Sequence, residues 1–149
     1  MKRRAMLFLF SLLVLPVYVS AQTSQKTEAA VMFERLLMGL NNTDFNAVLD
    51  LFADDVLFWG TSTKTLGTDS NGPRTYFASL AGGKPGVNVA SALDYSVREG
   101  AGGIQLLSGT WQVNIAGRDS KPVFRLSMAV AMRNGKWKIV QFHNSAMPQ

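Results

Sequence analysis

The fold is decided by the stretch Asn134-Gly135-Lys136-Trp137-Lys138-Ile139-Val140-Gln141-Phe142-His143-Asn144-Ser145, close to the C-terminus. Asn-Gly is the strongest two-residue hairpin signal, because both residues accept the positive φ that the tightest turns require. Apolar and polar residues alternate on both sides of this pair, over residues 123–132 and 137–145, as in half-buried strands. The stretch therefore predicts two long antiparallel strands joined by a tight turn.

Two further strands are expected before this hairpin. Alternation over residues 87–98 and 104–115 predicts them, and glycine-containing turns at 100–103 and 117–119 follow each one. Consecutive long strands joined by tight turns form an antiparallel sheet, in which one face packs on the core.

The N-terminal half reads as helices and one buried strand. Residues 28–40 carry apolar side chains at helical spacing, and a second helix with Thr43 as its N-cap follows. Residues 56–59 read as a buried strand with a short partner over 64–67, and a third helix begins near Pro73. This order predicts an α+β fold, with three N-terminal helices packed on a strongly curved antiparallel sheet.

The first residues have the features of a bacterial signal peptide. The basic start Lys2-Arg3-Arg4 precedes an apolar run over residues 5–19, and Ser20-Ala21 adds small residues suited to cleavage. The run is shorter than the roughly 20 residues that a membrane span needs, so we expect cleavage before Gln22, with a retained anchor as the alternative. The protein is expected to be secreted or periplasmic. We divide the chain into a signal peptide (1–21), a flexible leader (22–27) and one domain (28–149).

Composition excludes several kinds of chemistry. Three of the 15 Lys and Arg residues lie in the predicted signal peptide, which leaves 12 against 10 Asp and Glu and gives no reason to expect nucleic acid as a partner. The chain has no cysteine and one histidine, so neither thiol catalysis nor a metal site is expected. Nucleophile-elbow and phosphate-binding glycine motifs are also missing from the sequence. We expect no cofactor and, after cleavage, no membrane contact.

Four motifs carry a family resemblance: Leu51-Phe52-Ala53-Asp54-Asp55-Val56, Gly72-Pro73-Arg74-Thr75-Tyr76-Phe77, Arg125-Leu126-Ser127, and the final stretch from Gly135 to Pro148. They resemble motifs of the nuclear transport factor 2-like (NTF2-like) superfamily, which includes SnoaL-like polyketide cyclases, ketosteroid isomerase and scytalone dehydratase. The last motif is most similar to secreted bacterial members of the SgcJ/EcaC type (DUF4440-like). These in turn resemble the association (hub) domain of calcium/calmodulin-dependent protein kinase II. The resemblance implies a cone-shaped sheet that helices close, with a cavity at its wide end.

The chain departs from that kinase domain at functional positions. Two inward arginines that make an anion pocket there correspond to Met128 and to a position near Thr110, so we expect this pocket to be missing. The first histidine of the final motif is replaced by Gln141. The alignment places Thr110 inside the cone, whereas burial of the larger side chain would place Trp111 inside, and the sequence leaves both orientations open.

His143 is the best single candidate for a catalytic residue, although the sequence assigns no catalytic role. By period two it shares a strand face with Trp137, Ile139, Gln141 and Ser145, opposite Val140 and Phe142. A neutral imidazole on a pocket wall can serve as a general base or a hydrogen-bond donor. The alternative is a structural histidine that bonds to a neighbouring strand or loop. The residues expected to line the pocket are Trp59, Tyr76, Phe77, Met128, Gln141 and His143, with core packing as the alternative for the aromatic ones.

Two other groups of residues bear on function, one on acid–base catalysis and one on dimer formation. Asp54 and Asp55 are adjacent and point opposite ways on a strand, so capping and turn formation is favoured over paired acid–base catalysis. Arg125, Val140 and Phe142 are expected on the outer face of the sheet, where they would form the interface of a homodimer.

Two classes of function follow from these observations. The first is a pocket protein that binds, or converts without a cofactor, a small apolar or polyketide-like ligand; such an enzyme would be an isomerase, a cyclase or a dehydratase. The second is a noncatalytic, homo-oligomeric association module. Trp59, Tyr76 and His143 favour the pocket, whereas the missing arginines and Gln141 favour the module.

Overall fold

The computed structural model describes residues 26–79, 88–115, 119 and 121–148. The predicted signal peptide, most of the leader and most of the turn at 117–119 lie outside these residues. The elements are α1 (Glu28–Asn41), α2 (Phe45–Leu49), β1 (Phe52–Trp59), α3 (Asn71–Ala78), β2 (Asn88–Glu99), a 3-10 turn (Ala101–Gly103), β3 (Gln105–Ile115), β4 (Val123–Arg133) and β5 (Lys136–Ala146). Among the helices of this part of the chain, none has the length and apolar character needed to cross a bilayer.

The first two helices begin at side-chain caps. Thr27 caps α1 by accepting a hydrogen bond from the backbone N–H of Ala30 at 3.4 Å. Asp44 caps α2 and accepts from the N–H of Ala47 at 3.0 Å. The prediction of Thr43 as this cap was therefore wrong by one residue. Thr43 instead has a positive φ of 56° and turns the chain between the two helices.

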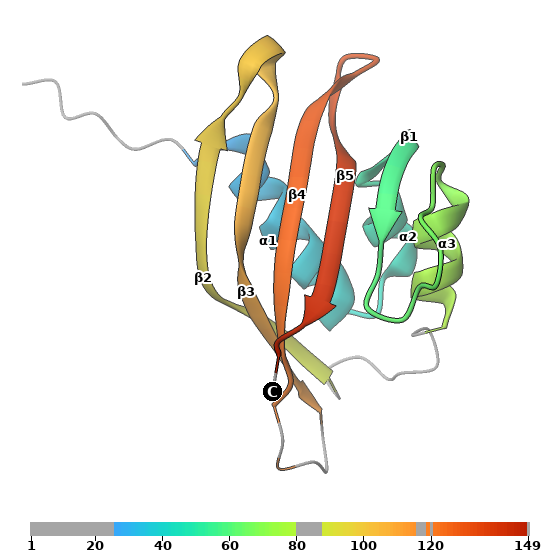
Figure 1. Ribbon diagram of the computed structural model, residues 1–149, viewed down its shortest axis with the longest axis vertical. Coiled ribbons are helices and arrows are strands. Elements are labelled where there is room, and N and C mark those ends of the chain that lie inside the picture. Colours follow the sequence, from blue (N-terminus) through green and yellow to red (C-terminus); the bar gives the residue numbers. More distant parts are fainter. Residues whose placement is uncertain (1–25, 80–87, 116–118, 120, 149) are drawn as a thin grey trace, which may run out of the picture.

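The five strands form one mixed sheet in the order β1-β5-β4-β3-β2 (Figure 1). β2 to β5 are antiparallel neighbours, as predicted, but β1 pairs with β5 in parallel. The expected partner of β1 over residues 64–67 is reduced to one bridge between Phe58 and Gly67. A parallel partner requires a long crossover, and here α3 and β2 to β4 supply it. The prediction of a wholly antiparallel sheet was therefore wrong.

The β4–β5 hairpin has the predicted turn and an unpredicted bulge. Asn134 and Gly135 have φ values of 50° and 76°, which confirms the tight turn. Further along, Val130 pairs with Ile139 and Ala129 with Gln141, so Val140 is an extra residue in β5. After this bulge, each side chain of β5 points to the face opposite the one that strict alternation along the strand predicts.

The side chains of β5 consequently lie on other faces than expected. Ile139, Phe142 and Asn144 are buried, whereas His143 is exposed and Gln141 is partly exposed. The prediction that Ile139 shares a face with Gln141 and His143 was wrong, and so was the placement of Phe142 on the outer surface. The cause is the single inserted residue, because a shift by one residue moves every later side chain to the opposite face.

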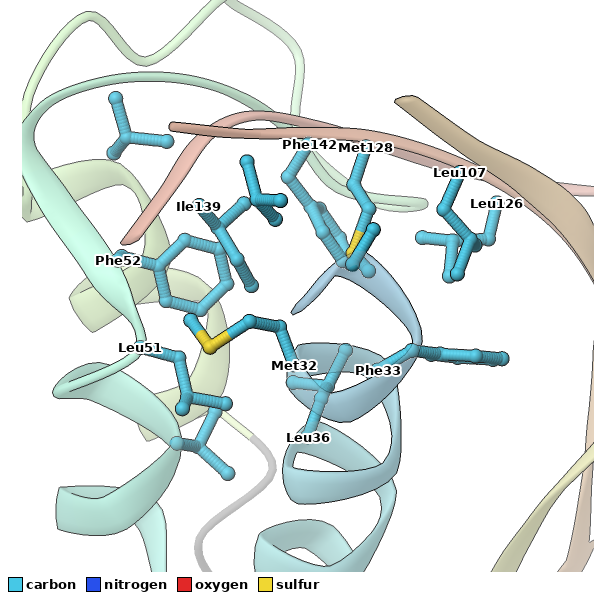
Figure 2. Packing of buried hydrophobic residues seen from close by; sticks show 14 of the residues in the cluster. Met32, Phe33, Leu36, Leu51, Phe52, Leu107, Leu126, Met128, Ile139 and Phe142 are labelled. Carbon is cyan, nitrogen blue, oxygen red and sulfur yellow. The ribbon is translucent and has the colours of Figure 1, made fainter. Parts of the chain in front are cut away.

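α1 packs across the concave face of the sheet (Figure 1), and its buried side chains join those of the strands in one hydrophobic core. Figure 2 shows Met32, Phe33 and Leu36 of this helix directed at side chains of β3, β4 and β5. The labelled partners from the sheet are Leu107, Leu126, Met128, Ile139 and Phe142.

An aromatic cluster joins β1 to this core. The ring of Phe58 is stacked on Phe142 with centroids 5.2 Å apart and 4° between the planes. Phe52 contacts both rings edge-on, at 5.7 Å from Phe58 and 5.6 Å from Phe142. Such aromatic pairs add stability beyond the area that they bury.

β3 settles the orientation that the sequence left open. Trp111 lies on the inner face and is 9% exposed, whereas Thr110 pairs with Arg125 on the outer face. Burial of the large apolar side chain of Trp111 therefore determines which face of β3 points to the core.

Neighbouring residues of β5 should differ sharply in their effect on stability. Phe142→Ala should lower the free energy of unfolding by about 3–5 kcal/mol, because it removes the centre of the aromatic cluster. His143→Ala should change it by less than about 0.5 kcal/mol, as expected of a surface position. Urea denaturation followed by tryptophan fluorescence measures both. Equal losses for the two variants would contradict the placement of the bulge.

Candidate functional site

A small cavity lies between the helices and the inner face of the sheet. α1 and α3 supply one wall and β3 and β5 the other, and the lining residues are Leu36, Leu40, Tyr76, Phe77, Trp111, Phe142 and Asn144. Its volume is about 30 Å³. That is room for roughly two water molecules and too little for a ring.

A chain of hydrogen bonds forms the polar end of this cavity. The indole N–H of Trp111 donates to Oδ1 of Asn144 at 2.9 Å, and Nδ2 of Asn144 donates to Oγ1 of Thr61 at 2.7 Å. The hydroxyl of Tyr76 donates to the same Thr61 oxygen at 3.3 Å. These three hydrogen bonds therefore link β3 to β5, β5 to the loop after β1, and that loop to α3.

Asn144 is the central member of this chain. Its side chain is 2% exposed, and the two bonds use one of its two N–H donors and one acceptor position of its oxygen. A buried amide that still has an unused hydrogen-bond donor and acceptor position is suited to orient one polar atom of a bound molecule.

The electrostatics of the cavity are those of a neutral site. The side chains that line it are uncharged, and Tyr76 alone among them carries a titratable group. The pKa of Lys26 is raised, because its ammonium donates a hydrogen bond to Glu34 at 2.6 Å, but this exposed pair takes no part in the lining. In the part of the chain that the structure describes, no three His, Asp or Glu side chains gather as a metal ion would require.

A larger cleft opens on the other side of Tyr76. It lies between the loop 61–67 and α3 and has a volume of about 480 Å³. Its lining is rich in hydroxyl and amide groups, from Ser62, Thr63, Thr65, Asn71, Thr75 and Ser79. Tyr76 lines both the cleft and the cavity, so it stands at their boundary.

The residues predicted to line a pocket divide between two faces of the sheet. Tyr76 and Phe77 line the cavity, and Met128 is buried in the core next to it. Trp59, Gln141 and His143 lie on the outer face, where Trp59 pairs with His143 and Leu57 with Gln141. Sequence reasoning missed Thr61 and Asn144 as site residues. Asn144 stands beside His143 in the final motif, but strict alternation assigned it to the wrong face.

The two aspartates do not form a catalytic pair. Asp54 and Asp55 are both exposed in the irregular part of β1. The backbone carbonyl of Asp54 accepts a hydrogen bond from the N–H of Ser70 at 3.0 Å, and the Asp55 carboxylate accepts from Arg133 at 3.4 Å.

The outer face of the sheet carries a regular cross-strand row. Trp59, His143, Ser127, Ser108 and Ser96 are successive partners from β1 to β2, and the hydroxyls of Ser108 and Ser127 lie 3.3 Å apart. The adjacent row holds Leu57, Gln141, Ala129, Leu106 and Arg98. Leu57 and Leu106 are each 46% exposed and Trp59 is 39% exposed, so this face combines apolar and polar groups.

This fold is that of a SnoaL-like domain. A family model for the SnoaL-like domain matches residues 30–149, and the chain belongs to that family. No curated protein matches the chain at a significant level.

Solved structures agree on the fold. A protein from Xanthomonas campestris named "putative calcium/calmodulin dependent protein kinase II association domain" has a TM-score of 0.72 and 22% identity, over 87% of this chain and 94% of its own. An NTF2-like protein of unknown function from Pseudomonas putida KT2440 has a TM-score of 0.72 and 16% identity, over 82% and 86%. A "putative ketosteroid isomerase" from Parabacteroides distasonis has a TM-score of 0.64 and 20% identity, over 85% and 92%. The resemblance read from the motifs is thereby confirmed as a shared NTF2-like fold.

Proposed function

We propose that this protein binds a small, uncharged and largely apolar molecule on the concave side of its sheet, without a cofactor. The observation that carries the proposal is the hydrogen-bond chain from Trp111 through Asn144 and Thr61 to Tyr76 at one end of an apolar cavity. Membership of the SnoaL-like family and the likeness to a protein named as a ketosteroid isomerase support a ligand-binding domain.

The cost of burying polar groups supports this assignment. An amide and an indole N–H that pack in an apolar interior lose their contacts with water, so a core selected for stability alone favours apolar side chains there. Asn144 nevertheless lines the cavity together with Phe142 and keeps unused hydrogen-bonding capacity. An apolar space with one convergent polar group is the usual form of a small-molecule site.

The same lining favours binding over catalysis. An isomerase, a cyclase or a dehydratase needs a group that moves a proton near neutral pH. The one titratable side chain among the described lining residues is the Tyr76 phenol, which donates a hydrogen bond to Thr61. His143, the earlier candidate for a base, lies on the opposite face.

A homodimer through the outer face of the sheet is proposed as a second property. Leu57 and Trp59 on β1 and Leu106 on β3 expose apolar side chains on this face, with Gln141 and Ala129 between Leu57 and Leu106. Exposed apolar side chains on one sheet face support a protein–protein interface there. Of the interface residues expected from the sequence, Arg125 lies on this face and Val140, the bulge residue, is partly exposed. Phe142 is buried and is replaced in the proposed interface by the exposed apolar residues of β1 and β3. Self-association is also the property that the alternative function, an association module, requires.

Secretion is the third proposed property, and it rests on the predicted signal peptide alone. The protein recovered from the periplasm or medium of a bacterial host should begin at or near Gln22, because the small residues before it suit signal peptidase. Mass spectrometry of the intact protein measures this. A mature protein that still carries Lys2-Arg3-Arg4 would contradict it.

Binding should depend on Asn144 and not on His143. A ring enters the cavity only if the side chain of Tyr76 moves aside toward the cleft. With the ring in place, we expect phenol to bind about tenfold more tightly than benzene, because one added neutral hydrogen bond is worth up to about 1.5 kcal/mol. Asn144→Leu and the milder Thr61→Val should reduce this preference, whereas the matched control His143→Ala should retain it. The indole N–H resonance of Trp111 in an NMR titration measures each affinity. Absence of binding, or a preference that His143→Ala removes, would refute the proposed site.

The oligomeric state has its own test. Multi-angle light scattering at micromolar concentration should give twice the monomer mass, and Leu106→Glu should return the protein to a monomer by placing a charge in the interface. Met38→Glu on α1 is the matched control, since Met38 is also exposed, at 59% against 46% for Leu106, but lies on a helix and not on the sheet. A monomeric mass for the unmodified protein would rule out the dimer.

A further inference from the structure

We infer that the cavity and the cleft are two compartments of one site, and that the ligand is an amphiphile. Its aromatic or alicyclic ring enters behind Tyr76, and an uncharged, hydroxylated group stays in the cleft. This inference rests on the proposed function and adds to it the class of the ligand and the route by which it enters.

Size shows that the cavity cannot act alone. Its volume of about 30 Å³ excludes a ring, whereas the cleft of about 480 Å³ falls within the range of roughly 300–1,000 Å³ that small-molecule sites occupy. One side chain, that of Tyr76, borders both spaces. Displacement of its ring would join them.

The packing of Tyr76 makes such a displacement feasible. Its ring lies over Gly60, where an added Cβ would come within 2.6 Å of Cδ2 and Cε2, so the glycine provides the space that the ring fills. Its other neighbours are Phe58 and Phe77, with centroids 5.4 Å and 5.1 Å away. The hydroxyl is held by one bond of 3.3 Å to Thr61, which is long for an O–H donor and therefore weak.

The two compartments have complementary chemistry. Behind Tyr76 the lining is Leu36, Leu40, Phe77, Trp111 and Phe142, with Asn144 as the polar group. In front of it, the lining combines apolar surface with hydroxyl and amide side chains, and Lys64 is the one charged side chain among the described lining residues. Hydroxyls and amides both donate and accept hydrogen bonds, which matches the hydroxyl groups of a polyol or a sugar. A ligand that satisfies both compartments therefore has an apolar end and a neutral, hydroxyl-bearing end.

A matched pair of probes tests the ligand class. Phenol offers only the ring and its oxygen, whereas phenyl β-D-glucoside adds a hydroxylated group of the right size for the cleft. The glucoside should bind at least about tenfold more tightly than phenol, as two additional neutral hydrogen bonds would provide. Isothermal titration calorimetry measures both, and glucose alone should not compete with phenol.

Two sets of variants test the compartments. Thr65→Val with Thr75→Val removes two cleft hydroxyls and should lower the affinity for the glucoside several-fold without affecting phenol. Thr68→Val with Thr110→Val, at positions outside the cleft, is the matched control. Tyr76→Ala should raise the affinity for phenol several-fold, because the ring no longer has to be displaced.

The possible failures are distinguishable. If phenol binds through Asn144 but the glucoside binds no better and the cleft variants have no effect, the amphiphile is refuted and the proposed function stands. If Tyr76→Ala leaves phenol binding unchanged, the route past Tyr76 is refuted. If benzene, phenol and the glucoside all fail to bind, both the inference and the proposed function are refuted.

Discussion

The extra residue Val140 in β5 is the constraint on which the rest of the structure depends. It lets Ile139 and Phe142 point to the same side of the sheet, where strict alternation would separate them. Phe142 then meets Phe58 in a stacked pair, and this contact fixes β1 against the edge of β5 in a parallel register. Without the bulge, Gln141 and His143 would point into the core in place of Phe142. Burying these polar side chains in an apolar core is unfavourable unless they find hydrogen-bond partners.

The same bulge determines what each face of the sheet can do. Inside, Asn144 enters an apolar environment and meets Trp111 and Thr61, so the cavity gains an uncharged polar end. Outside, His143 joins Trp59 and two serines in a row that water or another protein surface reaches. The titratable group that suits proton transfer is thus on the convex face, and the space suited to a ligand is on the concave face. This separation is the physical reason for proposing a binding protein rather than a catalyst.

The structural relatives share the fold, but they do not indicate which site or activity this chain has. The neighbours range from an association domain to a ketosteroid isomerase by name, at 22% and 20% identity, which is too distant to transfer a site. Met128, which corresponds to one of the inward arginines of the kinase association domain, is buried in the core. The neutral cavity around Asn144 is a feature of this chain's own residues.

The sequence by itself determined the element types, the β4–β5 hairpin and the family. These depend on local signals: helical spacing in α1, alternation in the long strands, and two residues at Asn134-Gly135 that accept a positive φ. Only the tertiary structure decided that β1 is parallel to β5, that Trp111 rather than Thr110 is buried, and that Asn144 rather than His143 faces the cavity. Each of these depends on a partner far away in the chain, since pairing with β1 and packing against α1 select the bulge and the register. Alternation shows which residues lie on opposite faces, but the contacts of the folded protein decide which face is buried.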